Sequence, residues 1–406
     1  MTSPKLRFKE FDGDWTLQNL SDSFSLISGY AFPSSASTDS GAKWLKIADV
    51  GIQEMTPNNP SYLPLEYLDK YSQFVVNKDD YVIALTRPIL NKKLKIAKIG
   101  NFYDGALLNQ RVAKISSRSN NLDFIYSLLQ KSKTVEELEN SIAGTDPPNL
   151  SLNDVKEIKL GFPSKEEQTK IASFISAVDE KIGQLKQKHE LLSQYKQGMM
   201  QKLFSQQIRF KADDGGEFGE WENKTLGEVG ENIIGLTYSP TDVTNDGTGI
   251  LVLRSSNIKE GRLDKSDQVR VNKKIKDKII VQPNDILICT RNGSQRLIGK
   301  SVIINDDEVM TFGAFMSIYR SEYNRFIAYL MQTPWFFEQV QMNLGARINQ
   351  ITTGTLNEFT FDFPCLEEQT KIANFLSAID QKIEVVAQQI EQAKQWKKGL
   401  LQQMFV

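Results

Sequence analysis

The chain has 406 residues, 40% of them hydrophobic and 24% charged, which is enough apolar material for two or three packed domains and too much for a disordered chain. Its formal net charge of −1 is unlike that of a strongly basic protein that coats DNA regardless of sequence, so nucleic-acid contacts would have to be focused on one face. Two cysteines and one histidine exclude a disulfide framework and a histidine-rich metal centre.

We expect a cytoplasmic protein in a reducing compartment, because the cysteines form no framework and no apolar run approaches the length that spans a bilayer. The first residues show no apolar targeting segment.

Residues 1–162 predict a unit of mixed α and β structure, with several short strands and a few helices. Residues 80–85 read as a buried strand that runs into Thr86 and Arg87, and residues 124–130 read as a helix. Lysines gather between them, and this run is either a phosphate-contacting focus or an ordinary solvated surface. These lysines are Lys92, Lys93, Lys95 and Lys98.

Residues 163–208 predict one long helix. Pro163 precedes it, and Glu166 and Glu167 place acid in the first turn, where the helix dipole favours negative charge. Apolar residues then recur every three or four positions for roughly five heptads, so the helix needs a partner for its stripe. The predicted interface residues are Ile171, Ile175, Val178, Ile182, Leu185 and Leu192.

The second half repeats the first. Residues 209–363 predict another mixed unit, and residues 364–406 predict a second long helix that matches the first without a gap up to Phe204 and Phe405. Its predicted interface residues are Ile372, Leu376, Ile379, Ile383, Val386 and Ile390.

The helices are more alike than the units that precede them. We therefore predict an α+β fold in which two mixed α/β domains are separated by an antiparallel pair of long helices, with an internal pseudo-two-fold repeat and units that have diverged. Weaker matches align the strand ending at Thr86 and Arg87 with the one ending at Thr290 and Arg291, and Gly105 with Gly313.

No motif in the chain predicts catalysis. Residues 146–149, Asp-Pro-Pro-Asn, superficially match the Asp-Pro-Pro-aromatic loop of amino methyltransferases, but the fourth residue is Asn and residues 347–350 do not repeat the pattern. A phosphate-binding glycine loop and an acidic nuclease cluster are missing from the sequence as well. We predict a protein without catalytic residues, bound metal or cofactor.

The loops contain residue types that read DNA, because arginine suits guanine, Asn or Gln suits adenine, and lysine or hydroxyl groups suit phosphates. For any one of them a surface or capping role is the alternative. The candidates in the first unit are Tyr30, Arg87, Lys92, Lys93, Asn109, Gln110 and Arg111. Those in the second are Tyr238, Arg254, Arg291, Asn292, Ser294, Gln295, Arg296 and Arg347.

Two repeated patterns resemble the DNA-specificity subunit of type I restriction-modification systems. Pro163 and Pro364 each begin a Pro-x-x-x-Glu-Gln-x-x-Ile-Ala helix, and a Gly-Asp-Trp or Gly-Glu-Trp triplet, ending at Trp15 and Trp221, opens each unit. The strand at residues 285–287 also resembles the family, and the likeness covers nearly the full length.

The resemblance implies two target-recognition domains, residues 1–162 and 209–363, that each read half of a bipartite asymmetric sequence in double-stranded DNA. The helices, residues 163–208 and 364–406, would set the spacer and dock two methyltransferase subunits. Restriction-translocase subunits would join for cleavage, and adenine methylation and ATP use would belong to these partners. Inserting residues between Ile208 and Glu217 is expected to alter the spacer.

The alternative from a different class is a coiled-coil protein-protein scaffold that does not bind DNA. The near-neutral charge and the prominent helical repeat favour it.

Overall fold

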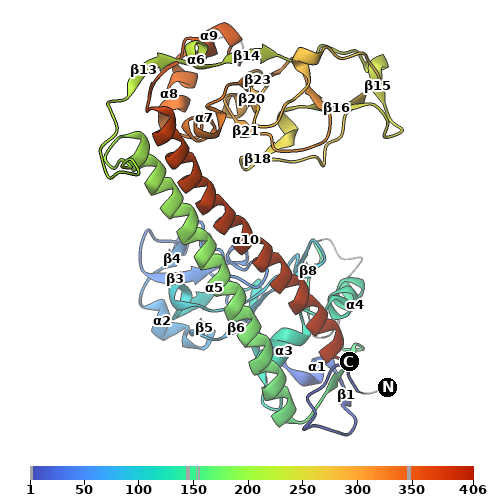
Figure 1. The fold of residues 1–406 in the computed structure, drawn as a ribbon. Coiled ribbons are helices and arrows are strands. Elements are labelled where there is room, and N and C mark those ends of the chain that lie inside the picture. The colour runs from blue at the N-terminus through green and yellow to red at the C-terminus, as the bar shows by residue number, and fades with distance from the viewer. Residues whose placement is uncertain (1–2, 143–146, 152, 154–155, 345–348) are drawn as a thin grey trace. The chain divides into compact units, whose positions relative to one another are not determined.

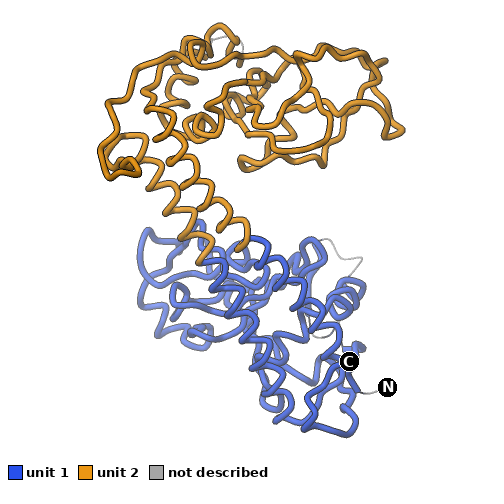
Figure 2. Tube along the Cα trace, in the orientation of Figure 1, with its two compact units in different colours: residues 1–187, 387–406 blue, residues 188–386 orange. Residues whose placement is uncertain are grey.

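The computed structural model describes residues 3–142, 147–151, 153, 156–344 and 349–406 (Figure 1). The chain forms two compact units, unit 1 with residues 1–187 and 387–406 and unit 2 with residues 188–386 (Figure 2). Two long helices, α5 (Lys165–Phe204) and α10 (Leu366–Met404), each contribute to both units. Within the described ranges, no helix combines the length and the apolar character needed to cross a membrane.

Unit 1 contains two four-stranded sheets. The first is antiparallel in the order β2-β11-β6-β9 and consists of Ser25–Ser28, Val112–Ser116, Tyr81–Ala84 and Ile96–Lys98. The second has the order β4-β3-β10-β5, with β3 and β10 parallel, and consists of Ser61–Leu63, Ala42–Leu45, Ala106–Leu108 and Val75–Val76.

Smaller elements complete unit 1. Two antiparallel pairs are β1 with β12 (Thr16–Asn19 and Lys159–Phe162) and β7 with β8 (Ile89–Leu90 and Lys93–Leu94). The short helices are α1 (Leu20–Ser23), α2 (Tyr67–Lys70), α3 (Leu122–Leu128) and α4 (Ser132–Ile142).

Unit 2 repeats this arrangement. One sheet has the order β14-β23-β20-β21 and consists of Glu231–Ile234, Met316–Arg320, Ile286–Cys289 and Ser301–Ile303. The other has the order β15-β19-β16-β22 and consists of Val243–Thr244, Arg270–Val271, Ile250–Leu253 and Met310–Phe312.

The remaining elements of unit 2 again flank the sheets. The paired strands are β13 with β24 (Glu222–Thr225 and Thr360–Phe363) and β17 with β18 (Ile258–Lys259 and Arg262–Leu263). The short helices are α6 (Leu226–Val229), α7 (Asn324–Leu330), α8 (Pro334–Met342) and α9 (Thr353–Asn357).

The apolar stripes of the long helices are buried. In unit 1 the first half of α5, including Ile171 and Ile175, shares a core with Leu400 and Met404 from the end of α10. In unit 2 the start of α10 shares a core with the end of α5. In both units the start of one long helix therefore packs against the end of the other, which confirms the predicted antiparallel pairing. All twelve predicted interface residues are buried except Leu192, which is half-buried.

Each mixed unit is joined to its long helix by an arginine-carboxylate pair. Arg7 donates to both carboxylate oxygens of Glu167, at 2.8 and 2.7 Å. Arg209 donates in the same way to Glu368, at 3.1 and 2.7 Å, and Trp221 Nε1 adds a third donor at 3.1 Å. The second glutamate of each Glu-Glu pair is therefore a buried anchor and not only a partner of the helix dipole.

A second repeated ion pair joins the long helices within each unit. Lys397 of α10 lies 2.7 Å from Asp179 of α5, and Lys196 of α5 lies 2.7 Å from Asp380 of α10. Lys397 also donates to Gln130, which follows α3, at 2.8 Å. Desolvation lowers the pKa of Lys397, although Asp179 favours its charged form.

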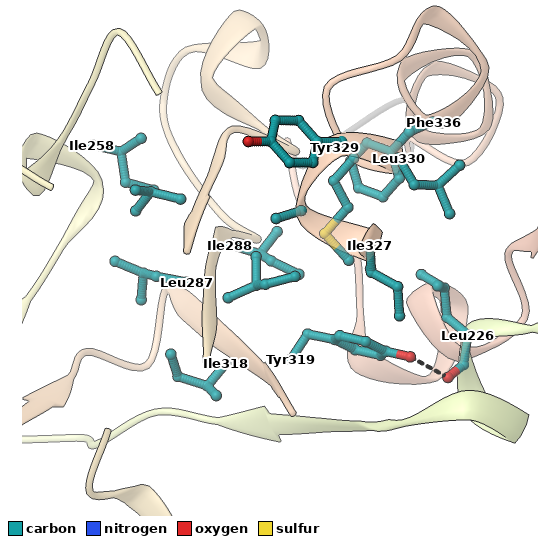
Figure 3. Packing of buried hydrophobic residues seen from close by; sticks show 14 of the residues in the cluster. Leu226, Ile258, Leu287, Ile288, Ile318, Tyr319, Ile327, Tyr329, Leu330 and Phe336 are labelled. Atoms are coloured by element: carbon teal, nitrogen blue, oxygen red, sulfur yellow. Dashed lines mark hydrogen bonds between the residues drawn. The ribbon is translucent and has the colours of Figure 1, made fainter. Parts of the chain in front are cut away.

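The core of unit 2 lies between its antiparallel sheet and helices α7 and α8 (Figure 3). Leu287 and Ile288 of β20 and Ile318 of β23 are fully enclosed. The continuous apolar run of β20 predicts a strand covered on both faces. The phenol of Tyr319 also lies in the core and donates to the Leu226 carbonyl at 2.8 Å. This bond satisfies a polar group that would otherwise be costly to bury.

One alignment between the units is wrong. The sequence matched Gly105 with Gly313, but Leu108 pairs with Leu45 in the parallel ladder just as Phe312 pairs with Leu253. The next residues, Asn109 and Gly313, each form a parallel bridge to the segment that follows the first strand of the antiparallel sheet. Gly313 therefore corresponds to Asn109, because strand pairing and not the shared Gly-Ala doublet fixes the register.

Candidate nucleic-acid interface

In unit 1, several predicted contact residues gather at one edge of the antiparallel sheet, where β2 and β6 end and β11 begins. Tyr30 forms a parallel bridge with Asn109, and its carbonyl accepts from the Gln110 backbone N–H at 3.1 Å. The Arg111 carbonyl accepts from the N–H of Leu85, which follows β6, at 2.9 Å. Gln110 and Arg111 are exposed, so successive residues at this edge carry an amide and a guanidinium group.

Arg87 lies at the same edge in an uncommon backbone conformation. Its φ is +47°, in the left-handed region that costs free energy for a residue other than glycine. Its N–H donates to the Pro148 carbonyl at 2.7 Å, and its side chain is exposed. A strained residue held by neighbouring backbone at a loop tip is typical of a functional position.

The β7–β8 hairpin follows directly and presents Lys92 and Lys93. Its two turn residues, Asn91 and Lys92, have φ of +51° and +57°, as a two-residue turn with the twist of its flanking strands requires. Both lysines are exposed. The other two lysines of the run predicted to contact phosphates are engaged within the fold. Lys98 pairs with Asp79 at 3.2 Å, and Lys95 is half-buried.

Lys95 is held by backbone. Its ammonium donates to the Ile47 carbonyl at 3.1 Å, and desolvation lowers its pKa. The lysine run therefore divides into two exposed side chains at a hairpin and two that serve the fold.

Tyr30 belongs to an aromatic cluster. Its ring lies 4.7 Å from Tyr71, 5.1 Å from Phe32 and 5.5 Å from Phe74, measured between centroids, and 40% of the residue is exposed. The cluster fixes the ring in place while leaving part of it accessible.

In unit 2, the equivalent edge lies where β20 ends and β23 begins. The Phe315 carbonyl accepts from the N–H groups of Thr290 and Arg291, at 3.1 and 3.0 Å, and the Arg291 guanidinium lies over the Phe315 ring at 4.8 Å. Both side chains are exposed, Phe315 by 57%. A phenyl ring under a guanidinium orients a charged group that would otherwise sample many rotamers.

Asn292 holds the loop that follows. Its side-chain oxygen accepts from the Ser294 N–H at 3.0 Å, and its Nδ2 donates to Ser255 Oγ at 2.9 Å. Gln295 and Arg296 come next, in a short 3₁₀ turn (Gln295–Leu297), and both are exposed. Asn292 and Ser294 therefore build the loop, while Gln295 and Arg296 extend from it.

The remaining candidates of unit 2 are Arg254, Tyr238 and Arg347. Arg254 forms an ion pair with Asp267, so its guanidinium is committed within the fold. Tyr238 is half-buried and lies near Gly313. Arg347 falls outside the described residues.

The basic run in unit 2, residues 273–278, is also divided. Lys273 pairs with Asp242 at 3.2 Å, and Lys278 pairs with Glu231. Lys274 and Lys276 are exposed.

The arginines that the sequence aligned are not equivalent. Thr86 bridges Asn149, whereas Arg291 bridges Gln350, and the N–H of Arg87 bonds to the backbone just as that of Asn292 does. Arg291 thus takes the place of Thr86, one residue from Arg87. Because side chains alternate along an extended chain, the two units present different groups at this edge.

Sequence reasoning missed Phe315, because a Gly-Ala-Phe triplet before an apolar run reads as the start of a buried strand. The structure begins β23 one residue later, and only the strand pairing reveals the exposed ring. Among the described residues, no group of three or more His, Cys, Asp or Glu could hold a metal ion.

The comparisons with known proteins point to one family. The model of the type I restriction modification DNA specificity domain matches residues 12–194 and again residues 219–395. The MjaVIII specificity subunit of Methanocaldococcus jannaschii is 32% identical over 209 residues, which is 51% of this chain and 49% of the relative. The EcoKI specificity subunit of Escherichia coli is 28% identical over 182 residues, 43% of this chain and 39% of the relative. The matches thus span half or less of the length of these relatives.

Two solved structures share the fold. The S subunit of a type I restriction-modification system from M. genitalium superposes with a TM-score of 0.62 at 16% identity, over 100% of this chain and 99% of that one. A chain from a structural study of type I restriction-modification complex assembly gives 0.56 at 19% identity, over 95% and 96%. Since the family model matches most of the chain in two copies, the chain belongs to the type I restriction-modification DNA specificity family.

Proposed function

We propose that this chain is the specificity subunit of a type I restriction-modification complex and that each unit reads one half of a bipartite, asymmetric DNA sequence. The supporting observation is that one sheet edge recurs in both units with different side chains. Thr86, Arg87 and Arg111 occupy it in unit 1, and Arg291 and Phe315 do so in unit 2. Two units with the same fold but different DNA-contacting side chains would recognise different half-site sequences.

The chain itself is proposed to be non-catalytic. The exposed polar residues at these edges include Gln110, Arg111 and Arg291, whose side chains suit hydrogen bonding to base edges and phosphates. Adenine methylation and ATP-dependent cleavage would be carried out by methyltransferase and restriction-translocase subunits that bind this chain.

The long helices support two docking sites for one kind of partner. Tyr195 of α5 and Trp396 of α10 occupy matching positions of the repeated helix and are 51% and 54% exposed. Trp396 packs edge-on against Phe174 at 6.0 Å, so its ring is held in place. Repeated aromatic side chains on a helix surface fit two copies of the same subunit, since such residues dominate interface energetics.

Exchange of the first target-recognition domain tests the proposal. Residues 1–162 are replaced by the corresponding segment of another family member, and the methylated sequence is determined in a host that supplies the methyltransferase subunit. One half of the site should change while the other half and the spacer persist. A change in both halves would contradict independent readers.

DNA binding itself is tested by a gel-shift titration of the complex with its methyltransferase subunits. Phosphate contacts release counterions, so affinity should fall steeply as salt rises from about 50 to 200 mM. A protein-protein scaffold without DNA contacts would show no specific shift at either salt concentration.

A further inference from the structure

We infer that Arg291, stacked on Phe315, reads a guanine in the half-site of unit 2. This inference rests on the proposed function and assigns one base to one side chain. Strand β20 is fully buried and ends at Cys289, and Arg291, two residues later, is exposed to solvent.

Hydrogen bonds hold the backbone of Phe315 beside that of Arg291. The Phe315 carbonyl accepts three hydrogen bonds, from the Thr290 N–H at 3.1 Å, the Arg291 N–H at 3.0 Å and the Thr290 hydroxyl at 3.0 Å. The ring and the guanidinium are therefore carried by chain segments bonded directly to each other. Stacking at 4.8 Å then restricts the arginine rotamers before any ligand arrives.

The donors of Arg291 are free. Within the described residues its guanidinium has no hydrogen bond and no ion pair, and in unit 2 only Arg296 shares this property. The other described arginines of the unit donate to a carboxylate or an amide. These pairs are Arg209 with Glu368, Arg254 with Asp267, Arg262 with Glu384, Arg270 with Glu308, Arg320 with Asp285, and Arg325 with Asn374.

Asn292, the next residue, cannot act as the reader without breaking the loop. Its amide oxygen and nitrogen are both engaged, with the Ser294 N–H and with Ser255 Oγ. Its backbone N–H bonds to the Asn349 carbonyl at 3.2 Å. These bonds hold the chain beside Arg291, whose guanidinium remains accessible.

A guanidinium that lies over a ring and has no partner among the described residues keeps its donors available. Two of them match the O6 and N7 acceptors of guanine in the major groove, a pattern that no other base pair presents. A phosphate would also accept from arginine, but it does not require a fixed plane. A guanidinium whose position is already limited by a ring therefore favours guanine.

Unit 1 has no equivalent of the Arg291–Phe315 pair among its described residues. The positions of Arg291 and Phe315 are taken there by Thr86 and Arg111, as the bridge to Asn149 and the bond to the Leu85 N–H show. The stacked pair thus contributes to the difference between the two half-sites.

The first experiment uses the full chain with its methyltransferase subunit and reads the methylated sequence. Arg291→Gln should relax one guanine in one half-site, with discrimination falling roughly 5- to 150-fold at that position. Arg296→Gln is the comparison at the other free arginine of the same loop: it should lower methylation at all sites equally if Arg296 contacts DNA, and leave the guanine preference at that position intact. Phe315→Leu should weaken discrimination, while Phe315→Tyr, which keeps a ring, should preserve it.

The second experiment substitutes 7-deazaguanine, which lacks the N7 acceptor, for that guanine in a synthetic duplex. Methylation by the unmodified complex should fall severalfold, and the Arg291→Gln complex should be insensitive to the replacement.

An unchanged motif with uniformly weaker methylation of every site by Arg291→Gln would show a phosphate contact and overturn the inference. So would a half-site for unit 2 that contains no guanine. Failure of the proposed function looks different, because the unsubstituted complex would then methylate no bipartite sequence at all.

Discussion

At the scale of single residues, the two cysteines differ in reactivity. Cys289 lies buried in β20, and desolvation raises its pKa to about 11, whereas Cys365 is exposed at the start of α10. Because the thiolate is the nucleophile, a disulfide reagent at pH 8 should titrate one thiol of the native chain rapidly and a second only after denaturation. Cys365→Ser should abolish the rapid phase, and rapid modification of both native thiols would contradict the burial of β20.

Two tyrosines, the buried Tyr319 and the half-buried Tyr126, predict a loss of stability in alkali. Burial raises the pKa of Tyr126 and of Tyr319 above the ordinary value near 10, so the unfolded chain loses these protons before the folded chain does. The folded state then binds more protons, and stability falls as pH rises through the unfolded pKa. At pH 10.5 each such tyrosine should lower the free energy of unfolding by about 0.8 kcal/mol.

The measurement is the urea midpoint at pH 8.5 and at pH 10.5. Tyr126→Phe removes one ionisable phenol and should reduce the drop between the two midpoints. An unchanged drop in this variant would show that Tyr126 ionises in the folded state.

At the scale of elements, the two glutamates in the first turn of α10 differ in burial and therefore in their expected contribution to stability. Glu368 is fully buried on Arg209, and Glu367 beside it is exposed. Glu368→Gln should destabilise unit 2 by about 2–3 kcal/mol, less than a fully buried pair because 26% of the Arg209 side chain is exposed. Glu367→Gln should cost under about 0.5 kcal/mol.

Urea unfolding followed by circular dichroism compares these two variants of equal charge. Equal losses would assign the effect to the helix dipole, since both carboxylates lie in the first turn of the helix.

The same elements show how far sequence reasoning reaches. The long helices were predictable because their stripe repeats every three or four residues along one segment. The role of Glu167 was not, since Arg7 lies 160 positions away and a local pattern cannot show such a contact. The candidate loops were found by residue type, but the stacked Phe315 and the one-residue offset between Arg87 and Arg291 depend on strand register. Register is set by partners distant in sequence.

At the scale of the whole molecule, the connection after α5 contains two structurally different segments. Residues 205–208 close the helix, where the N–H of Ile208 bonds to the Lys202 carbonyl at 3.3 Å and Gln206 has φ of +59°. Residues 211–217 form a separate surface turn, closed by the bridge between Lys211 and Glu217. An added residue there bulges into solvent, because the pairing on both sides of it is preserved.

We therefore expect the spacer to depend on the length of α5, which ends at Phe204, and not on the stretch between Ile208 and Glu217 that the sequence pointed to. If the long helices set the distance between half-sites, lengthening α5 by four residues before Ser205 should change the number of unread bases in the methylated sequence, while both half-sites persist. The same four residues inserted between Asp214 and Gly215 should leave the spacer unchanged. Methylome sequencing of hosts that carry each variant distinguishes them. An equal effect of both insertions would show that chain length, and not the helix, measures the spacer.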